Sequence, residues 1–399
     1  MRELLQTLLK SKSIIKKMYH ILFNLIGYLP VKKDLIIFES FLGKQYSDNP
    51  RAIYEYLKEH HPEYQLLWSI DKRYKQNFLD AKVSFVNRFS IKWLLLMPRA
   101  NYWVINSRMP YWIRKPKHTV YLQTWHGTPL KKLAADMEEV HMPGTTTDKY
   151  KQLFLMETRN WDYLISPNRY STDIFQSAFQ YNKEKILETG YPRNDYLINN
   201  NTIEAVNSIK KSLGLPKNKK IILYAPTWRD DEYVKVGQYK FTLHLELEQL
   251  QRSLGDEYVI LLRMHYLIAN KMDVSTYKGF AHDFSKHDDI RDLYLISDVL
   301  ITDYSSVFFD YLCLKRPIIF YTYDIDSYRD KLRGFYFDIE KDAPGTLAKT
   351  TEEVLEAIKS IETKRSESLI RFHQEFCNLE KGISTERVVK SVFLERATK

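Results

Sequence analysis

Residues 291–321 read RDLYLISDVLITDYSSVFFDYLCLKRPIIFY, and this stretch decides the fold class. The β-branched run at 299–302 predicts a short strand, an apolar helix begins at Ser305, and residues 318–321 predict the next strand. This order is typical of a parallel α/β sheet, whose ligands lie beyond the carboxyl ends of the strands. Helix N–H groups at such a position can bind an anion. The residues that occupy it are Asp303, Tyr304, Ser305 and Ser306.

Length and composition exclude several classes of protein. The chain has 399 residues, enough for two domains, and its 14% aromatic content argues against disorder. Its two cysteines form no disulfide framework or metal-binding pattern, which suits a reducing cytoplasm. The adjacent Asp230 and Asp231 diverge in direction, which favours a loop cluster over a metal pair. We therefore expect neither a metal nor another cofactor.

The formal net charge of +10 predicts an acidic partner. Charge alone does not choose between nucleic acid, anionic lipid and a phosphate-bearing substrate. The sequence has no zinc spacing, Walker loop or RNA-binding signature, so we do not expect a nucleic-acid partner.

Residues 1–30 predict amphipathic helices, because apolar residues recur at steps of three and four with lysines between them. Such a segment can lie in the headgroup layer of an anionic membrane. The alternative is an ordinary surface helix packed on the first domain. No run of about 18 apolar residues occurs, so we expect no membrane-spanning helix.

Short apolar runs alternate with helical patterns in the first half of the chain, which predicts a parallel sheet with helices on both faces. The loop at 43–46 is either a phosphate-binding turn or a simple connection. Strand patterns occur at 35–38, 64–70, 83–86, 102–105, 120–124 and 164–165, and helical patterns at 51–60, 91–97 and 170–179.

The strand at 120–124 runs directly into Trp125 and His126, which leaves His126 at the strand end. Functional groups lie at strand ends in such folds, and the neighbouring Gly127 permits close approach of the backbone. A neutral imidazole there could take a proton from a hydroxyl nucleophile near pH 7. A structural histidine is the alternative.

Three consecutive strands of the second half, at 221–224, 259–262 and 299–302, also end in polar residues. A guanidinium binds phosphate in two-pronged fashion, and a histidine can protonate or hydrogen-bond a departing phosphate oxygen. Convergence on one sheet edge predicts a phosphate or diphosphate site. The alternatives are scattered salt bridges and, for Asp303 and Ser305, helix capping. The strand-end residues are Thr227, Arg229, Arg263, His265, Asp303, Ser305 and Ser306.

The polar residues 199–202 and the basic residues 217–220 mark a domain boundary. We expect one Rossmann-like domain at 31–205 and a second at 206–362. Helices are predicted at 351–362 and 365–396, and the segment 363–399 is expected to cross back to the first domain.

Six motifs, in this order, resemble those of the CDP-glycerol glycerophosphotransferase family, which includes the wall teichoic acid polymerases and primases. The resemblance runs from about residue 35 to the end and is strongest to the short teichoic acid glycerophosphate transferases that extend a primed linkage unit. The motifs are WHGTPLK at 125–131, SPN at 166–168, GYPRND at 190–195, YAPTWR at 224–229, RMH at 263–265 and TDYSS at 302–306.

The resemblance implies a GT-B-like fold, in which two Rossmann-like domains face each other across a cleft. It implies a catalytic base, His126, and a donor site where His265, Arg229 and the turn at 303–306 hold a pyrophosphate. Further substrate-binding positions carried over by matching are Trp125, Gly127, Thr128, Pro226, Thr227, Arg263 and Thr302.

The same resemblance implies the partners and the location. The donor is CDP-glycerol, the acceptor is linked to undecaprenyl diphosphate, and the protein is peripheral on the cytoplasmic side of the cell membrane, held there by residues 1–30. CDP-ribitol as donor and a priming reaction are alternatives within the family. A sugar transferase that uses a nucleotide-sugar is the alternative outside it; Ser305 and Ser306, in place of the usual paired glycines, favour the phosphotransferase.

Overall fold

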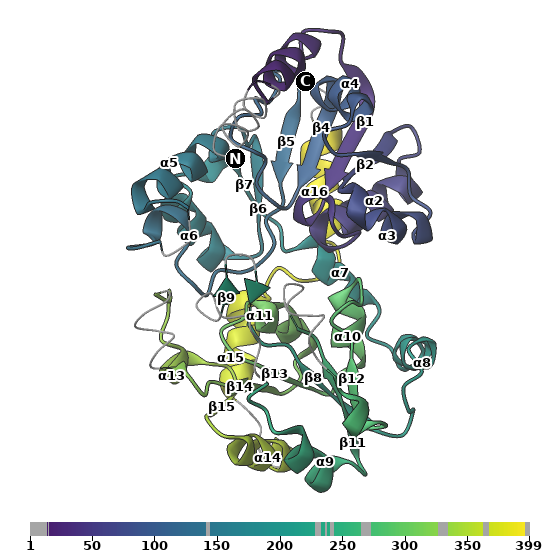
Figure 1. Cartoon of the computed structure of the whole chain (residues 1–399), viewed down its shortest axis with the longest axis vertical. Helices are drawn as coiled ribbons and strands as arrows, with labels where there is room; N and C mark the ends of the chain where they lie inside the picture. The colour runs from purple at the N-terminus through teal and green to yellow at the C-terminus, as the bar shows by residue number, and fades with distance from the viewer. Residues whose placement is uncertain are drawn as a thin grey trace, which may run out of the picture.

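Two parallel β-sheets organise the chain, and Figure 1 shows them one above the other. The computed structural model describes residues 14, 16–140, 144–227, 233–235, 238–239, 243–264, 273–325, 334–361 and 367–395. The predicted α/β fold with two Rossmann-like domains is confirmed. Nothing can be said of Arg229 and His265, which lie outside the described residues.

The first sheet has seven strands in the order β3-β2-β1-β4-β5-β6-β7, and every pair is parallel. This is the Rossmann order with one strand added. Its strands are β1 (Lys32–Glu39), β2 (Gln65–Ile70), β3 (Phe85–Asn87), β4 (Ala100–Ile105), β5 (Val120–Gln123), β6 (Tyr163–Ser166) and β7 (Ile186–Glu188).

The second sheet has six parallel strands in the order β12-β11-β8-β13-β14-β15, which is again the Rossmann order. They are β8 (Lys220–Tyr224), β11 (Tyr258–Leu262), β12 (Ala281–Asp283), β13 (Val299–Thr302), β14 (Ile318–Tyr321) and β15 (Thr346–Ala348). A separate antiparallel pair is formed by β9 (Tyr233–Lys235) and β10 (Gln238–Tyr239).

Helices cover both faces of each sheet, which explains why the strands are continuously apolar. Leu35 and Ile37 of β1 pack into one cluster, whereas Ile36 and Phe38 pack into another on the opposite face. The helices are α2 (Asp48–His60), α3 (Lys75–Asp80), α4 (Ile91–Leu96), α5 (Thr147–Thr158), α6 (Arg169–Ala178), α7 (Pro192–Asn199), α8 (Ile203–Ser212), α9 (Leu247–Leu254), α10 (Ile290–Ile296), α11 (Val307–Tyr311), α13 (Ile339–Asp342), α14 (Thr351–Lys359), α15 (Glu367–Phe376) and α16 (Ser384–Val389).

The single helix predicted at 365–396 is wrong, because the chain breaks it between α15 and α16. Gly382 has φ of 77°, a left-handed conformation that ends a helix readily. The carboxylate of Asp195 accepts hydrogen bonds from the backbone N–H groups of Ser384 and Thr385, at 2.9 and 2.7 Å, and so begins α16 at a point fixed by the first domain. A π-helical turn follows at Lys390–Leu394.

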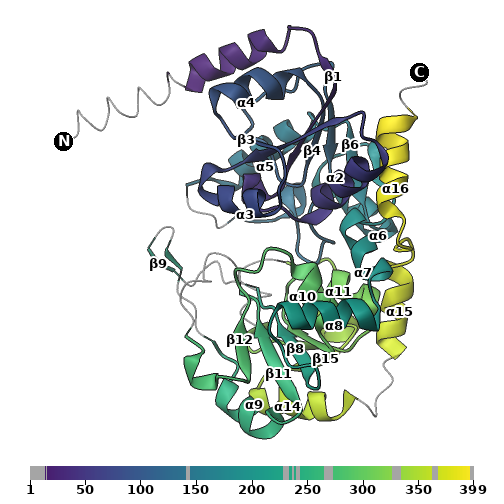
Figure 2. The same ribbon diagram turned by 90° about the vertical axis from the view of Figure 1, so that its right-hand side faces the viewer.

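The C-terminal segment contacts both domains along one side of the molecule (Figure 2). Phe376 of α15 packs in the core of the second domain, and Phe393, which follows α16, packs in the core of the first. Cys377 and Cys313 are buried free thiols whose sulfur atoms are 3.5 Å apart. The boundary predicted between residues 205 and 206 falls inside α8.

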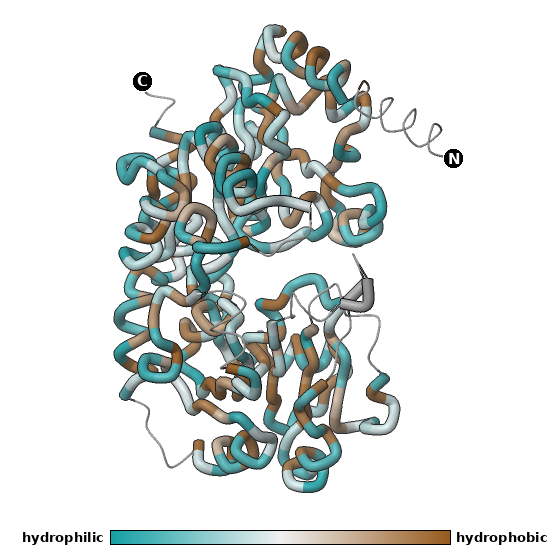
Figure 3. Tube along the Cα trace, turned by 60° about the vertical axis from the view of Figure 1, so that its left-hand side comes forward, coloured by the Kyte–Doolittle hydropathy of each residue, from teal (hydrophilic) through white to brown (hydrophobic). Residues whose placement is uncertain are grey.

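Residues 16–26 form a helix at one end of the first domain. Phe23 is buried against Trp93, with ring centroids 5.7 Å apart, so the helix packs on the domain. A second side of this helix is apolar but exposed, and Figure 3 shows the mixed character along its length. Among the described residues, no helix combines the length and the apolarity needed to cross a membrane. The exposed apolar residues are Ile14, Met18, Ile21, Leu22, Leu25, Tyr28 and Leu29.

Candidate active site

The two sheets present the carboxyl ends of their strands to each other. In both, the strand order reverses next to the first strand, at β1/β4 and at β8/β13, and ligands of such sheets bind at this reversal. The two edges meet at Gly127, which follows β5, and Ser306, which follows β13. A Cβ atom added to Gly127 would lie only 2.8 Å from Ser306 Oγ, so glycine is required for this close approach.

Backbone contacts between two short segments also join the domains. Lys131 forms an antiparallel bridge with Phe335, and Lys132 N–H donates to Gly334 O at 2.8 Å. Tyr336 N–H donates in turn to Leu130 O at 2.9 Å. The segment that follows the WHGT motif is thereby bound to the second domain by backbone hydrogen bonds.

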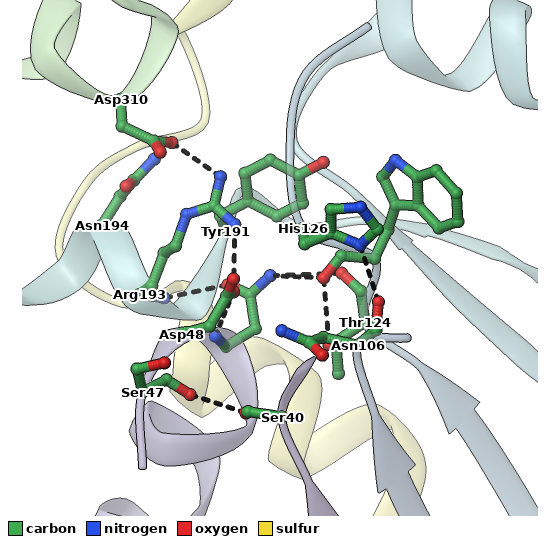
Figure 4. Close-up of polar contacts among 12 residues, drawn as sticks. Ser40, Ser47, Asp48, Asn106, Thr124, His126, Tyr191, Arg193, Asn194 and Asp310 are labelled. Carbon is green, nitrogen blue, oxygen red and sulfur yellow. Dashed lines mark hydrogen bonds and ion pairs between the residues drawn. The ribbon is translucent and has the colours of Figure 1, made fainter. Parts of the chain in front are cut away.

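His126 lies on the first-domain edge with its ring oriented by a backbone carbonyl (Figure 4). Its Nδ1 is 2.8 Å from Asn106 O, and a carbonyl can only accept, so Nδ1 carries a proton. In the neutral ring, Nε2 is then the atom with a free lone pair. The side chain is exposed, yet protein surrounds much of it, and this partial burial lowers the pKa of His126 from its usual value. The geometry favours a neutral imidazole that can accept a proton at Nε2.

Local strain and aromatic packing present this ring. Trp125 has φ of 51°, uncommon for a bulky residue, and its N–H donates to Gln123 Oε1 at 3.0 Å. The indole packs against Phe179, with centroids 4.7 Å apart, and against the ring of His126 at 4.5 Å. The left-handed turn therefore buries the tryptophan and leaves the histidine facing outward.

Arg193, in the GYPRND motif, is the centre of a buried ionic cluster that touches both domains (Figure 4). Its guanidinium donates to Asp48 at 3.0 Å and to Asp310 at 2.9 Å. Asp48 begins α2 in the first domain, whereas Asp310 belongs to α11 in the second. Sequence reasoning quoted the motif but assigned Arg193 no role, because neither partner is near it in the chain.

Asn49 connects this cluster to the histidine loop. Its side-chain carbonyl accepts from Arg193 N–H at 3.1 Å, and its amide donates to Thr124 O at 3.1 Å and Trp125 O at 3.4 Å. The backbone that carries His126 is therefore braced against α7, the helix that begins the connection between the domains.

Glu380 is a further buried carboxyl group at this junction. Its Oε1 accepts from Tyr191 N–H and from Asn194 Nδ2, each at 3.0 Å. Burial raises the pKa of Glu380 to about 8. The junction therefore contains an acid that is largely protonated at neutral pH.

The predicted residues of the second-domain edge connect the strand ends and the turn to their neighbours. Asp303 Oδ1 accepts from Thr227 N–H at 2.8 Å, which joins the ends of β13 and β8. Thr302 Oγ donates to Ala225 O at 2.7 Å, and the buried Tyr304 stacks on Phe335 with centroids 5.5 Å apart. The α11 helix has Ser306 at its N-cap without a side-chain cap, and it is only five residues long.

The remaining predicted residues are distributed as follows. Gly127 and Thr128 are buried beside His126, and Pro226 and Ser305 are partly exposed on the opposite edge. Arg263 donates to the carbonyl groups of Phe284 and Ser285, at 2.9 and 2.6 Å, and so braces the loop after β12.

The loop at 43–46 has the close packing of a structural turn. Gly43 has φ of 80°, and its carbonyl accepts from Asp71 N–H at 2.8 Å. A Cβ atom added to Gly43 would lie 2.6 Å from that nitrogen, so only glycine allows this loop to pack so closely against the end of β2.

Comparison with known proteins agrees with the motifs. Residues 21–394 match the family described as CDP-Glycerol:Poly(glycerophosphate) glycerophosphotransferase. A teichoic acid poly(glycerol phosphate) polymerase from Bacillus spizizenii is 58% identical over 388 residues, which are 96% of this chain and 98% of that protein. A polymerase of the same description from Bacillus subtilis is 59% identical over 383 residues, 95% of this chain, but the chain spans only 51% of that protein's length.

A solved structure matches the whole chain. A variant of the wall teichoic acid polymerase TagF, soaked with CDPG, superposes with a TM-score of 0.90 at 44% identity and covers 100% of this chain and 98% of that one. The family resemblance inferred from the six motifs is therefore confirmed, and the chain belongs to the CDP-glycerol glycerophosphotransferase family.

Proposed function

We propose that this chain transfers glycerol phosphate from CDP-glycerol to a hydroxyl group of a lipid-linked teichoic acid precursor and releases CMP. One observation carries the proposal: a histidine with a free Nε2 lies on the first-domain edge, where Gly127 meets Ser306 of the second. Family membership supports the donor, and both relatives described above are named as glycerol phosphate polymerases.

The chemistry is an in-line phosphoryl transfer, in which the protein positions groups and offsets charge. The acceptor oxygen attacks the phosphorus that bears glycerol, and its proton passes to Nε2 of His126. The bond from that phosphorus to the oxygen of the cytidylyl phosphate breaks, and CMP leaves with the bonding electrons. The carbonyl of Asn106 holds Nδ1–H throughout, so it stabilises the imidazolium that forms.

The donor is assigned to the second-domain edge. The turn at 303–306 and the N–H groups near it would face the pyrophosphate, and Thr227 and Asp303 fix the relative position of two strand ends. Arg229 and His265 keep their predicted roles on the leaving group.

We also assign the protein to the cytoplasmic surface of the cell membrane. The exposed apolar side of the helix at 16–26, next to Lys16 and Lys17, supports contact with an anionic lipid surface. A lipid-linked acceptor would then be reached at the membrane surface.

The test is incubation of the purified protein with CDP-glycerol, and separately with CDP-ribitol, plus a lipid-linked disaccharide that carries one glycerol phosphate. We expect acceptor-dependent CMP from CDP-glycerol, and product masses separate one addition from a polymer. CMP from CDP-ribitol alone would keep the mechanism and change the donor. CMP from neither would overturn the proposal and favour a nucleotide-sugar donor.

A further inference from the structure

Arg108 lies beside the site but belongs to none of the motifs. It follows β4 by three residues, at the strand-order reversal of the first sheet, and is two residues beyond the Asn106 carbonyl that holds His126. Its charge reaches the histidine, because it is among the groups that lower the pKa of His126. Arg108 is therefore part of the electrostatic environment of the reacting group.

Aromatic rings hold the guanidinium in place. Its central carbon lies 4.2 Å from the ring centroid of Phe154 and 5.5 Å from that of Tyr150, both on α5. Phe154 in turn packs on Trp125, with centroids 6.2 Å apart, and Trp125 packs on His126. A continuous series of ring contacts thus fixes Arg108 relative to the catalytic base.

No carboxylate of the described residues forms an ion pair with Arg108. Glu157, on α5, is close enough to feel the charge of Arg108 but forms no ion pair with it; its Oε1 accepts from Met109 N–H at 3.2 Å and from Tyr121 OH at 3.1 Å. Burial raises the pKa of Glu157 to about 7, so its carboxyl is only partly ionised at neutral pH. A half-buried, stacked guanidinium without a carboxylate partner is suited to bind an anion from a ligand.

We propose that Arg108 binds the phosphate group of the acceptor end, next to the glycerol whose hydroxyl is attacked. The inference rests on the proposed function. A glycerol already attached through phosphate places an anion three carbons from its free hydroxyl, whereas an unprimed sugar end has no phosphate there. Arg108 would therefore select acceptors that already carry glycerol phosphate, and it is a specificity residue for extension.

The test compares two lipid-linked acceptors that differ in one charge. Both carry a terminal glycerol; in one it is joined through an ordinary phosphodiester, and in the other that phosphate is blocked as its neutral methyl ester. Wild type, Arg108→Ala, Arg108→Gln and Arg108→Lys are assayed for CMP release, with Arg114→Ala as the control, since Arg114 is exposed on the same β4–β5 connection.

We expect Arg108→Ala to lower kcat/KM for the charged acceptor by roughly 10- to 100-fold, the size of a lost hydrogen bond between charged groups. The neutral acceptor should change by less than about threefold and KM for CDP-glycerol should not change, so the preference for the charged acceptor disappears. Arg108→Gln should lose the preference in the same way, and it provides the test if Arg108→Ala fails to fold. Arg108→Lys should retain part of the preference.

Equal losses on both acceptors, or a rise in KM for CDP-glycerol, would overturn the assignment, as would an unchanged preference. If wild type releases no CMP with either acceptor, the proposed function itself fails, and this inference fails with it. That outcome is distinct, because it appears before any variant is compared.

Discussion

The two edges of the site are built differently. On the first-domain edge, strain at Trp125 and the carbonyl of Asn106 combine to present one reactive nitrogen of His126. On the second-domain edge, Asp303 and Thr302 hydrogen-bond to the backbone of the β8 end and so fix the shape of a surface. Under the proposed function, this difference would be a division of labour, in which the first edge supplies a reacting group and the second supplies a rigid frame for the donor.

The largest effect is expected at His126. His126→Gln should lower kcat by about 10²–10⁴-fold, the usual contribution of a general base. In wild type, kcat/KM should rise with pH and level off at a pH below about 6.5, the ordinary histidine pKa, because burial lowers the pKa of His126 and the neutral ring is the active form. Steady-state rates between pH 5 and 8 check both points, and a wild-type level of activity in the variant would contradict the first.

A substitution at Arg193 tests whether its ion pairs with Asp48 and Asp310 hold the two domains together. Arg193→Lys should lower the free energy of unfolding by about 3–5 kcal/mol, because a lysine cannot bridge Asp48 and Asp310 and leaves one buried carboxylate unpaired. Urea denaturation measures the change. Arg169→Lys is the matched control, since the Arg169–Asp173 ion pair is exposed and should change stability by less than about 1 kcal/mol. Similar changes in the free energy of unfolding of both variants would contradict a stabilising role for the Arg193 bridge.

The contact between Gly127 and Ser306 tests how closely the edges approach. Gly127→Ala should lower kcat/KM by roughly 10- to 100-fold, because the new Cβ would displace Ser306 and misalign the edges. Adding Ser306→Ala removes the oxygen at 2.8 Å and leaves Cβ at a tolerable 3.4 Å, so the double variant should be more active than the product of the two single effects predicts. Simple additivity would mean that the edges do not touch during turnover.

Glu380 predicts a pH dependence of stability at the junction. Glu380 has a pKa of about 8 in the folded chain, against about 4.3 for a free glutamate, so the folded state retains a proton that the unfolded state releases. Its stabilising contribution is complete below about pH 4 and is lost as pH rises toward 8, by up to about 1.4 kcal/mol per unit. Glu380→Gln should remove that slope from urea denaturation between pH 5.5 and 7.5, and equal slopes in the two proteins would exclude the effect.

Patterns over a few neighbouring residues were enough to predict many of the strands. The apolar run at 299–302 and the polar residues after it suffice to predict a strand and the turn that follows it. The same holds for 120–124 and His126. The short strands β7 and β15 were not predicted, because each has three residues and the residues beside it add no strand pattern, unlike those at 83–86 that predicted β3.

The features that could not be predicted from the sequence depend on contacts between residues far apart in the chain. Arg193 is 145 residues from Asp48 and 117 from Asp310, so no spacing rule connects them. The break between α15 and α16 depends on Asp195, 189 residues before Ser384. Arg108 has no local pattern either, since its position is defined by the rings of α5.

The division of labour between the edges is tested most directly by calorimetric measurement of CDP-glycerol binding to two variants. The account predicts that His126→Gln binds CDP-glycerol within about threefold of the wild-type Kd, although catalysis is lost. Asp303→Ala should bind at least about tenfold more weakly, because the donor surface loses the acceptor of the hydrogen bond from Thr227. Weak binding by His126→Gln together with normal binding by Asp303→Ala would contradict the account.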